Sequence, residues 1–184
     1  MSEWLADLSQ MLPPPIHPVN SAVDWTLIES QLGFMLPSDY KEYITCFGSG
    51  QLSCGLLVYN YSVPEHRERI ATDMDILTDI RRGNNDLRVQ LSGPSGVTDE
   101  SILSFSVHPE PGGLLQWGYC QEGWRFYWTT TGATESWGIF VTRDWERICY
   151  HFPNISFHSF IRGLFVNPFD EELRCERDFF PLPC

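Results

Sequence analysis

The chain has 184 residues, of which 42% are hydrophobic and 14% aromatic, a composition that suits one folded domain and excludes a disordered chain. Its 12 basic and 24 acidic residues give a net charge of −12, which repels phosphate backbones and anionic membrane surfaces. We therefore expect no nucleic acid and no membrane as direct partner, and we favour a partner protein with a basic face.

The sequence also bears on the cellular compartment. No run of 18 apolar residues occurs, and the first ten residues carry no Lys or Arg, so neither a membrane span nor a secretory signal is expected. The six cysteines are scattered and form no C-x-x-C pair. We expect a cytoplasmic protein whose thiols are reduced.

The first third of the chain predicts three helices. A short amphipathic helix over 3–12 is followed by a proline-containing linker over 13–20. A second helix is expected to begin near Ser21, which has the spacing of a capping box with Asp24, and to end at Gly33.

A third helix is expected to follow Leu36, with Pro37 at its first helical position and the glycines of 48–50 at its end. Residues 56–61 are β-branched and aromatic enough for a strand. Pro64 then opens a further helix that runs to about residue 82.

After residue 84 the apolar pattern changes from a helical period to alternation. It predicts strands over 102–107, 114–120, 124–130 and 137–142, and then a helix over 154–165. This order favours an α+β fold, with an antiparallel mixed sheet of about five or six strands packed against N-terminal helices and a C-terminal helix. We expect a single domain over 1–184, with a leading helix and proline linker over 1–20, a core over 21–166 and an acidic tail over 167–184 that runs over the surface.

Motifs for catalysis and metal binding are weak. Three candidate ligands lie close together in the sequence, Cys149, His151 and His158, but structural zinc takes four ligands, usually as two closely spaced pairs. No G-x-S-x-G elbow occurs, and Cys46 lies within a helical apolar stripe, where a buried inert thiol is expected. We expect no catalytic residue, no metal and no cofactor; a hydrolase that uses a Cys or a carboxylate is the enzyme alternative.

Aromatic residues gather between positions 117 and 137. On an extended strand, Trp124, Phe126 and Trp128 share one face, and Arg125 and Tyr127 share the other. The first face suits a core, while the second is open to two interpretations, a core or a binding face rich in interface anchors.

A longer pattern begins with Trp25-x-x-Ile28-Glu29 and resembles the opening of the SUKH superfamily of bacterial immunity proteins. The residues that carry the resemblance are Trp25, Ile28, Glu29, Gly33, Leu36, Pro37, Tyr40, Tyr43, Gly48 and Gly50, followed later by Trp117, Gly118 and Trp128. The similarity extends roughly over 23–165. These residues are mostly fold-making and identify a scaffold.

The resemblance implies a protein that binds and neutralises a cognate toxin by occluding its active or substrate-binding site. The toxin would carry a basic cleft, as a nuclease does, and the immunity protein would be a monomer or a weak homodimer. The alternative is a non-catalytic regulatory scaffold of the same fold, because fold does not fix function.

Two groups of residues are predicted to contact the partner. The acidic rim lies on predicted helix and loop surfaces and comprises Asp73, Asp75, Asp79, Asp99 and Glu100. The aromatic anchors are Tyr119, Trp124 and Tyr127.

Overall fold

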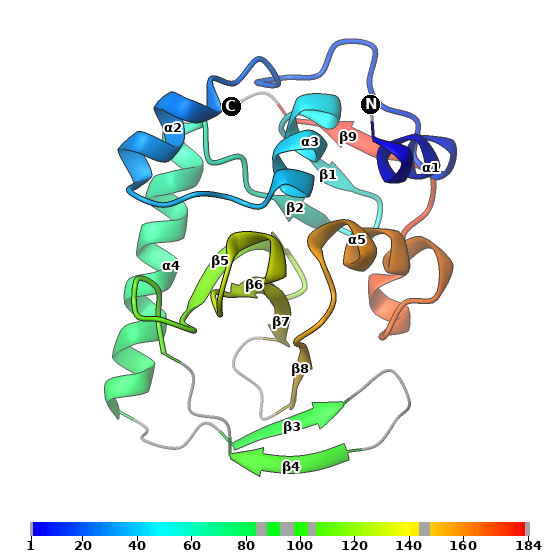
Figure 1. Ribbon diagram of the computed structural model, residues 1–184. Helices are drawn as coiled ribbons and strands as arrows, with labels where there is room; N and C mark the ends of the chain where they lie inside the picture. The colour runs from blue at the N-terminus through cyan, green and yellow to red at the C-terminus, as the bar shows by residue number, and fades with distance from the viewer. Residues whose placement is uncertain (1, 84–87, 93–97, 103–105, 144–147, 183–184) are drawn as a thin grey trace. The chain divides into compact units, whose positions relative to one another are not determined.

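The computed structural model describes residues 2–83, 88–92, 98–102, 106–143 and 148–182 (Figure 1). The chain forms two compact units, one made of Met1–Arg67 with Phe157–Cys184 and the other of Glu68–Ser156. Helices dominate the start of the chain and antiparallel strands its middle, which confirms the predicted α+β class.

Four helices belong to the first unit: α1 (Glu3–Met11), α2 (Trp25–Leu32), α3 (Ser38–Phe47) and α5 (Phe157–Val166). The predicted capping box at the start of α2 is wrong. Asp24 is the N-cap and its Oδ1 accepts the Leu27 N–H at 3.1 Å, whereas the Ser21 hydroxyl donates to the Pro18 carbonyl at 3.2 Å. Gly33 ends α2 in the left-handed conformation, as predicted, with a φ of 78°.

The end of α3 shows why a glycine is required there. Gly48 has a φ of 71° and a ψ of −153°, a combination that is essentially restricted to glycine. A Cβ at this position would lie 2.2 Å from the Val19 carbonyl oxygen. The absence of a side chain therefore lets the linker pass directly over the exit of α3.

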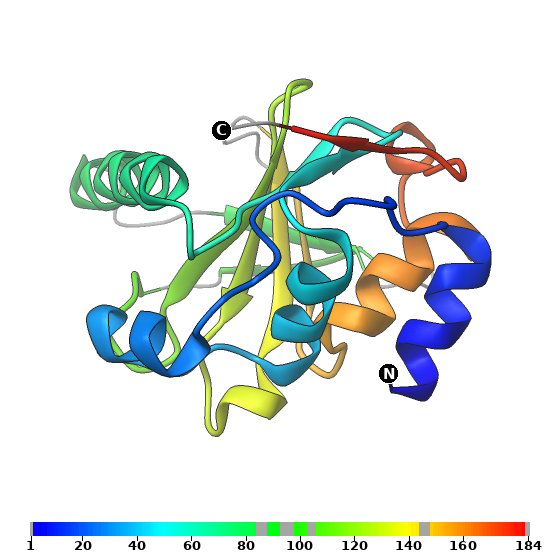
Figure 2. The same ribbon diagram turned by 90° about the horizontal axis from the view of Figure 1, so that it is seen from above.

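Helix α5 lies beside α1 in both Figure 1 and Figure 2. Arg162 Nε donates to Asp7 Oδ2 at 2.7 Å across this pair. Helix α5 also contacts α3, where Asp39 Oδ2 accepts the His158 backbone N–H at 3.0 Å. The C-terminal helix is thus joined to two N-terminal helices within the first unit.

Three short strands complete this unit: β1 (Gly50–Leu52), β2 (Leu56–Val58) and β9 (Phe179–Pro181). β1 pairs antiparallel with both β2 and β9. Cys54 and Cys175 form a disulfide with a Cα–Cα distance of 4.8 Å. The tail is therefore not a loose surface segment, and the expectation that all thiols are reduced is wrong for this pair. A 3-10 turn, Glu171–Leu173, lies between α5 and the disulfide.

The helix α4 (Pro64–Gly83) leads into the second unit. The strands of that unit are β3 (Arg88–Ser92), β4 (Thr98–Ile102), β5 (Leu114–Cys120), β6 (Trp124–Thr129), β7 (Gly138–Arg143) and β8 (Ile148–Phe152). Their order is β4-β3-β8-β7-β6-β5, and the pairs are antiparallel except for parallel β3 and β8. This arrangement matches the expected mixed sheet, and the three strands of the first unit add to the predicted count. A 3-10 turn, Thr134–Ser136, precedes β7.

The predicted strands are confirmed where the aromatic pattern is strong. Those expected near 114, 124 and 137 correspond to β5, β6 and β7, and Gly123 turns the β5–β6 connection with a φ of 90°. The strand expected over 102–107 falls largely on residues 103–105, which lie outside the described part of the chain. On either side of that gap, Ile102 belongs to β4 and Val107 forms an isolated bridge to Leu114.

Candidate partner-binding surface

The residues of the predicted acidic rim are not all exposed to solvent. Asp75 is exposed on α4, but Asp73 is 6% exposed and its Oδ2 lies 3.0 Å from Arg125 Nη1. The rim placement of Asp73 is therefore wrong. Its spacing from Ile70 and Leu77, both buried, already puts it on the inward stripe of α4, and this signal could have revealed the burial.

The other predicted acids lie outside the described side chains. Asp79 is in α4, and Asp99 and Glu100 are in β4, where they stand opposite Leu91 and Gln90 in the register. Their partner contacts stay predictions.

The three predicted aromatic anchors have different environments. Tyr119 is half-buried, and the guanidinium carbons of Arg69 and Arg125 each lie 5.5 Å from its ring centroid. Trp124 is 3% exposed and Tyr127 is fully buried, so neither offers a surface. Tyr127 packs in a cluster with Leu77, Leu114 and Phe140. The face of β6 that carries Tyr127 therefore belongs to the core, like the face that carries Trp124, and is not a binding face.

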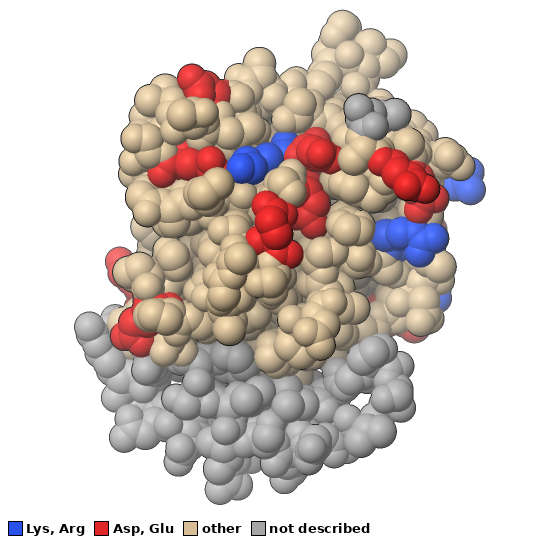
Figure 3. Space-filling model, viewed as in Figure 1, with Lys and Arg blue, Asp and Glu red and all other residues tan. Residues whose placement is uncertain are grey.

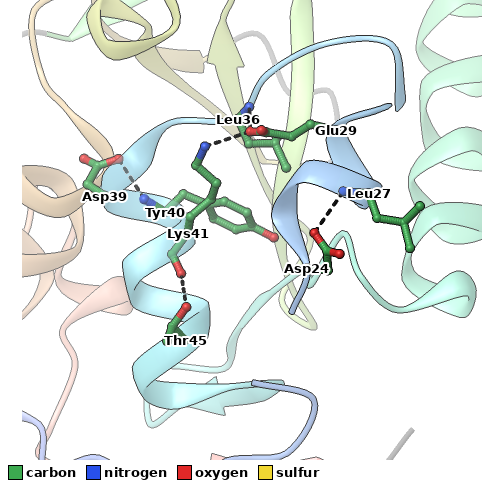
Figure 4. Close-up of polar contacts among 8 residues, drawn as sticks. All are labelled: Asp24, Leu27, Glu29, Leu36, Asp39, Tyr40, Lys41 and Thr45. Atoms are coloured by element: carbon green, nitrogen blue, oxygen red, sulfur yellow. Dashed lines mark hydrogen bonds and ion pairs between the residues drawn. The ribbon is translucent and has the colours of Figure 1, made fainter. Parts of the chain in front are cut away.

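The residues of the family-like pattern hold the first unit together. Glu29 Oε1 accepts the Leu36 N–H at 2.8 Å and lies 2.8 Å from Lys41 Nζ (Figure 4). One carboxylate thus ties α2, the turn after it and α3. The side chain of Glu29 is only 15% exposed, so its contacts are largely shielded from solvent.

Tyr40 has a similar role in the same unit. Its hydroxyl donates to the Tyr59 carbonyl at 2.6 Å and accepts the Tyr61 N–H at 3.0 Å. Burial raises the pKa of Tyr40 far above its ordinary value, so the phenol stays neutral. Tyr43 packs on Phe47 and Phe157, with ring centroids 4.8 Å and 5.5 Å away.

The later part of the pattern is an aromatic core in the second unit. Trp117 and Trp128 are fully buried, and their ring centroids lie 6.1 Å apart. Gly118 pairs with Phe126 where a bulge shifts the β5–β6 register after Gln116. The pattern residues are therefore fold-making in both units, as the sequence predicts.

The described free thiols are poor nucleophiles. Burial raises the pKa of Cys120 to about 12 and also raises the pKa values of Cys46 and Cys149. Because the thiolate is the reactive form, little of it is present at neutral pH.

An arrangement that the sequence did not predict joins Asp39, His158 and Ser159. Asp39 Oδ2 lies 3.2 Å from His158 Nδ1, and Ser159 Oγ lies 3.2 Å from His158 Nε2. The order resembles a hydrolase relay, but the contacts also have a structural explanation. Asp39 accepts two backbone N–H groups, those of Tyr40 and His158, and so caps the first turn of α5. Ser159 adjoins His158 in the chain and lies on an exposed helix surface.

Metal-ligand side chains do not converge in the described ranges, where no group of three His, Cys, Asp or Glu residues could hold an ion. Cys149 and His151 lie in β8, while His158 lies in α5. Among the described helices, none is long and apolar enough to cross a membrane.

Comparison with known protein families gives a match that covers most of the chain. The family model described as SMI1-KNR4 cell-wall, SUKH type 6, matches residues 23–161, about three quarters of the chain. No curated protein and no solved structure matches significantly. The matched range begins before α2 and ends within α5, so it includes both the Glu29 network and the aromatic strands. The chain therefore belongs to the SUKH, or SMI1-KNR4, family.

Proposed function

We propose that this chain is an immunity protein that binds a cognate toxin in the cytoplasm and blocks its active or substrate-binding site. Family membership is the observation that carries the proposal. In this proposal the chain acts by binding alone and catalyses no reaction. It works as a monomer or a weak homodimer.

Charge supports a basic partner. The net charge is −12, and on the face drawn in Figure 3 acidic side chains form several groups while Lys and Arg are fewer. Toxins that act on nucleic acid need a basic cleft to hold phosphates. An acidic inhibitor is steered onto such a cleft and covers it, with an association rate that falls as salt rises.

The test is co-expression with a toxin encoded beside this chain. Growth should be rescued, and the two proteins should purify together as a complex that buries about 1,200–2,000 Å². Rescue without any complex would overturn neutralisation by occlusion. A complex with a housekeeping protein, and none with the toxin, would favour the regulatory scaffold.

The exposed acid on α4 gives a local test. Asp75→Lys changes the charge of a solvent-facing position without disturbing a contact that the described residues make. Slower association with a weaker salt dependence would place the partner near α4. An unchanged rate would remove the part of α4 around Asp75 from the interface and leave the proposed function itself standing.

A further inference from the structure

The first unit contains an open cleft of about 350 Å³ between the segment that leads into α2 and the start of α4. Val23, Leu27 and Val63 contribute apolar surface, and the charged residues that line it are Asp24 and Glu65. Asp24 and Leu27 project from the first turn of α2 (Figure 4). Leu27 is 54% exposed, so an aliphatic side chain faces solvent beside two carboxylates.

A buried side chain joins the two sides of this cleft. Asn60 is fully buried, and its Nδ2 donates to the Asn20 carbonyl at 2.9 Å. Its Oδ1 accepts the Ser62 N–H at 3.0 Å. Asn20 and Ser62 line the cleft on the α2 side and the α4 side. Because one residue fixes both sides, the cleft is formed before a ligand enters, which lowers the entropic cost of binding.

The local charge selects a cation. Asp24 caps α2 and Glu65 stands in the first turn of α4, so each carboxylate faces the positive end of a helix. A helix terminus carries about half a unit of positive charge, less than the full negative charge of a carboxylate. The cleft therefore stays negative.

We propose that this cleft docks a basic segment of the toxin, with an aliphatic side chain against Leu27 and Val63 and an Arg or Lys beside Asp24 and Glu65. The inference rests on the proposed function and names the part of the first unit that meets the partner. A protein segment fits better than a small molecule, because small-molecule pockets enclose most of the ligand's surface, whereas this cleft is open and Leu27 is 54% exposed.

The first experiment uses a random peptide library displayed on phage and selected on the full-length protein. We expect enriched sequences that place Arg or Lys next to an aliphatic residue. In ¹⁵N spectra of the protein, the corresponding synthetic peptide should shift the backbone amides of residues 22–27, 62, 63 and 65. Acidic or uncharged enriched sequences, no enrichment, or shifts confined to other amides would overturn the proposal.

Variants separate the apolar contact from the charge. Leu27→Ala removes apolar surface without changing the charge and should weaken binding of the selected peptide about thirtyfold, the loss expected at an interface hot spot. Val166→Ala is the matched control, since Val166 is 52% exposed on α5 and lies outside the cleft lining. Asp24→Asn with Glu65→Gln removes both charges, and Asn caps a helix as well as Asp does, so the fold is kept. Peptide binding by this double variant should be weaker and should depend less on salt concentration.

The toxin co-expression assay distinguishes the two proposals. If the unchanged chain rescues growth and Leu27→Ala does not, while Val166→Ala still does, both proposals stand. If Leu27→Ala rescues growth and binds the toxin as tightly as the unchanged chain, the cleft proposal is overturned and the immunity function survives. If neither the unchanged chain nor any variant rescues growth, but binding of the peptides still requires Leu27 and the two acids, the immunity function fails while the docking chemistry holds.

Discussion

The two units use different interactions to fix their structure. In the first, polar side chains bind backbone groups of distant turns, as Glu29 does for Leu36 and Tyr40 for Tyr59 and Tyr61. In the second, β6 and its neighbours are fixed by ring packing, with Tyr127 and Phe140 6.3 Å apart, and by a buried ion pair between Arg125 of β6 and Asp73 of α4. The comparison teaches that one family pattern can contain two kinds of structural residue, and that substitutions should cost stability for different reasons in each unit.

The largest effect is expected on α4, in the second unit. Asp73→Asn leaves Arg125 without its carboxylate partner, and breaking a buried ion pair costs about 3–5 kcal/mol. Asp75 lies two residues further along α4 and is exposed, so Asp75→Asn serves as the control. It should change the free energy of unfolding by less than about 0.5 kcal/mol. Urea unfolding of both variants measures the difference. Equal costs would show that Asp73 is not buried in an ion pair.

Glycines in the first unit provide a second test. Gly48→Ala requires a rare backbone conformation and places a Cβ 2.2 Å from the Val19 carbonyl oxygen, so we expect a loss of about 2–4 kcal/mol. Gly163→Ala, inside α5, has no atom within 4 Å of its added Cβ and should stabilise by about 0.5–1 kcal/mol. Thermal unfolding would record opposite shifts. A stable Gly48→Ala variant would contradict the close passage of the linker.

The Glu29 network should give a smaller, graded effect. Glu29→Ala removes both contacts and should cost about 1.5–3 kcal/mol, whereas Glu29→Gln keeps an acceptor for the Leu36 N–H and should cost less. The matched control is Glu171→Gln, because its ion pair with Arg174 is exposed to solvent and such pairs contribute little to stability. Denaturant midpoints would rank the three. A Glu29→Ala cost no larger than that of Glu171→Gln would mean that the network is only a surface contact.

The smallest effect concerns pH in the first unit. His66 Nδ1 accepts the Asn60 N–H at 2.8 Å, and burial lowers the pKa of His66 in the folded state. The unfolded chain therefore takes up this proton first, so stability falls as pH drops through the ordinary histidine pKa near 6.5.

His66→Asn keeps an acceptor that does not titrate, and the decline in the free energy of unfolding from pH 7 to 5 should be shallower. Burial also lowers the pKa values of His108 and His151 in the second unit, so part of the decline should persist. Identical pH profiles for the two proteins would exclude the His66 contribution.

Local signals in the sequence predict much of the fold. Helical spacing predicts α1, α3 and α4, and Gly33 and Gly123 mark a helix end and a strand turn because they adopt positive φ. The strands that were not predicted, β1, β3, β4, β8 and β9, are three to five residues long, and the pairings of β1 with β9 and of β3 with β8 join partners far apart in the chain.

The binding residues were harder to predict for the same reason. Trp124 and Tyr127 have the composition of interface anchors, yet each face of β6 is covered. The partner of Asp73, Arg125, lies about fifty positions along the chain, and no local pattern reveals that contact. The cleft depends on Asn60 contacting both Asn20 and Ser62, a convergence that only the folded chain displays.

The first unit is assembled from both ends of the chain, with β9 paired to β1 and Cys175 joined to Cys54. During synthesis, residues 1–67 must wait for the segment from Phe157 onward, which at roughly 5–20 residues per second arrives about 5–20 s later. Residues 68–156 are contiguous and leave the ribosome in one stretch. Ribosome-stalled chains should therefore show protease protection of the middle segment before that of the N-terminal helices.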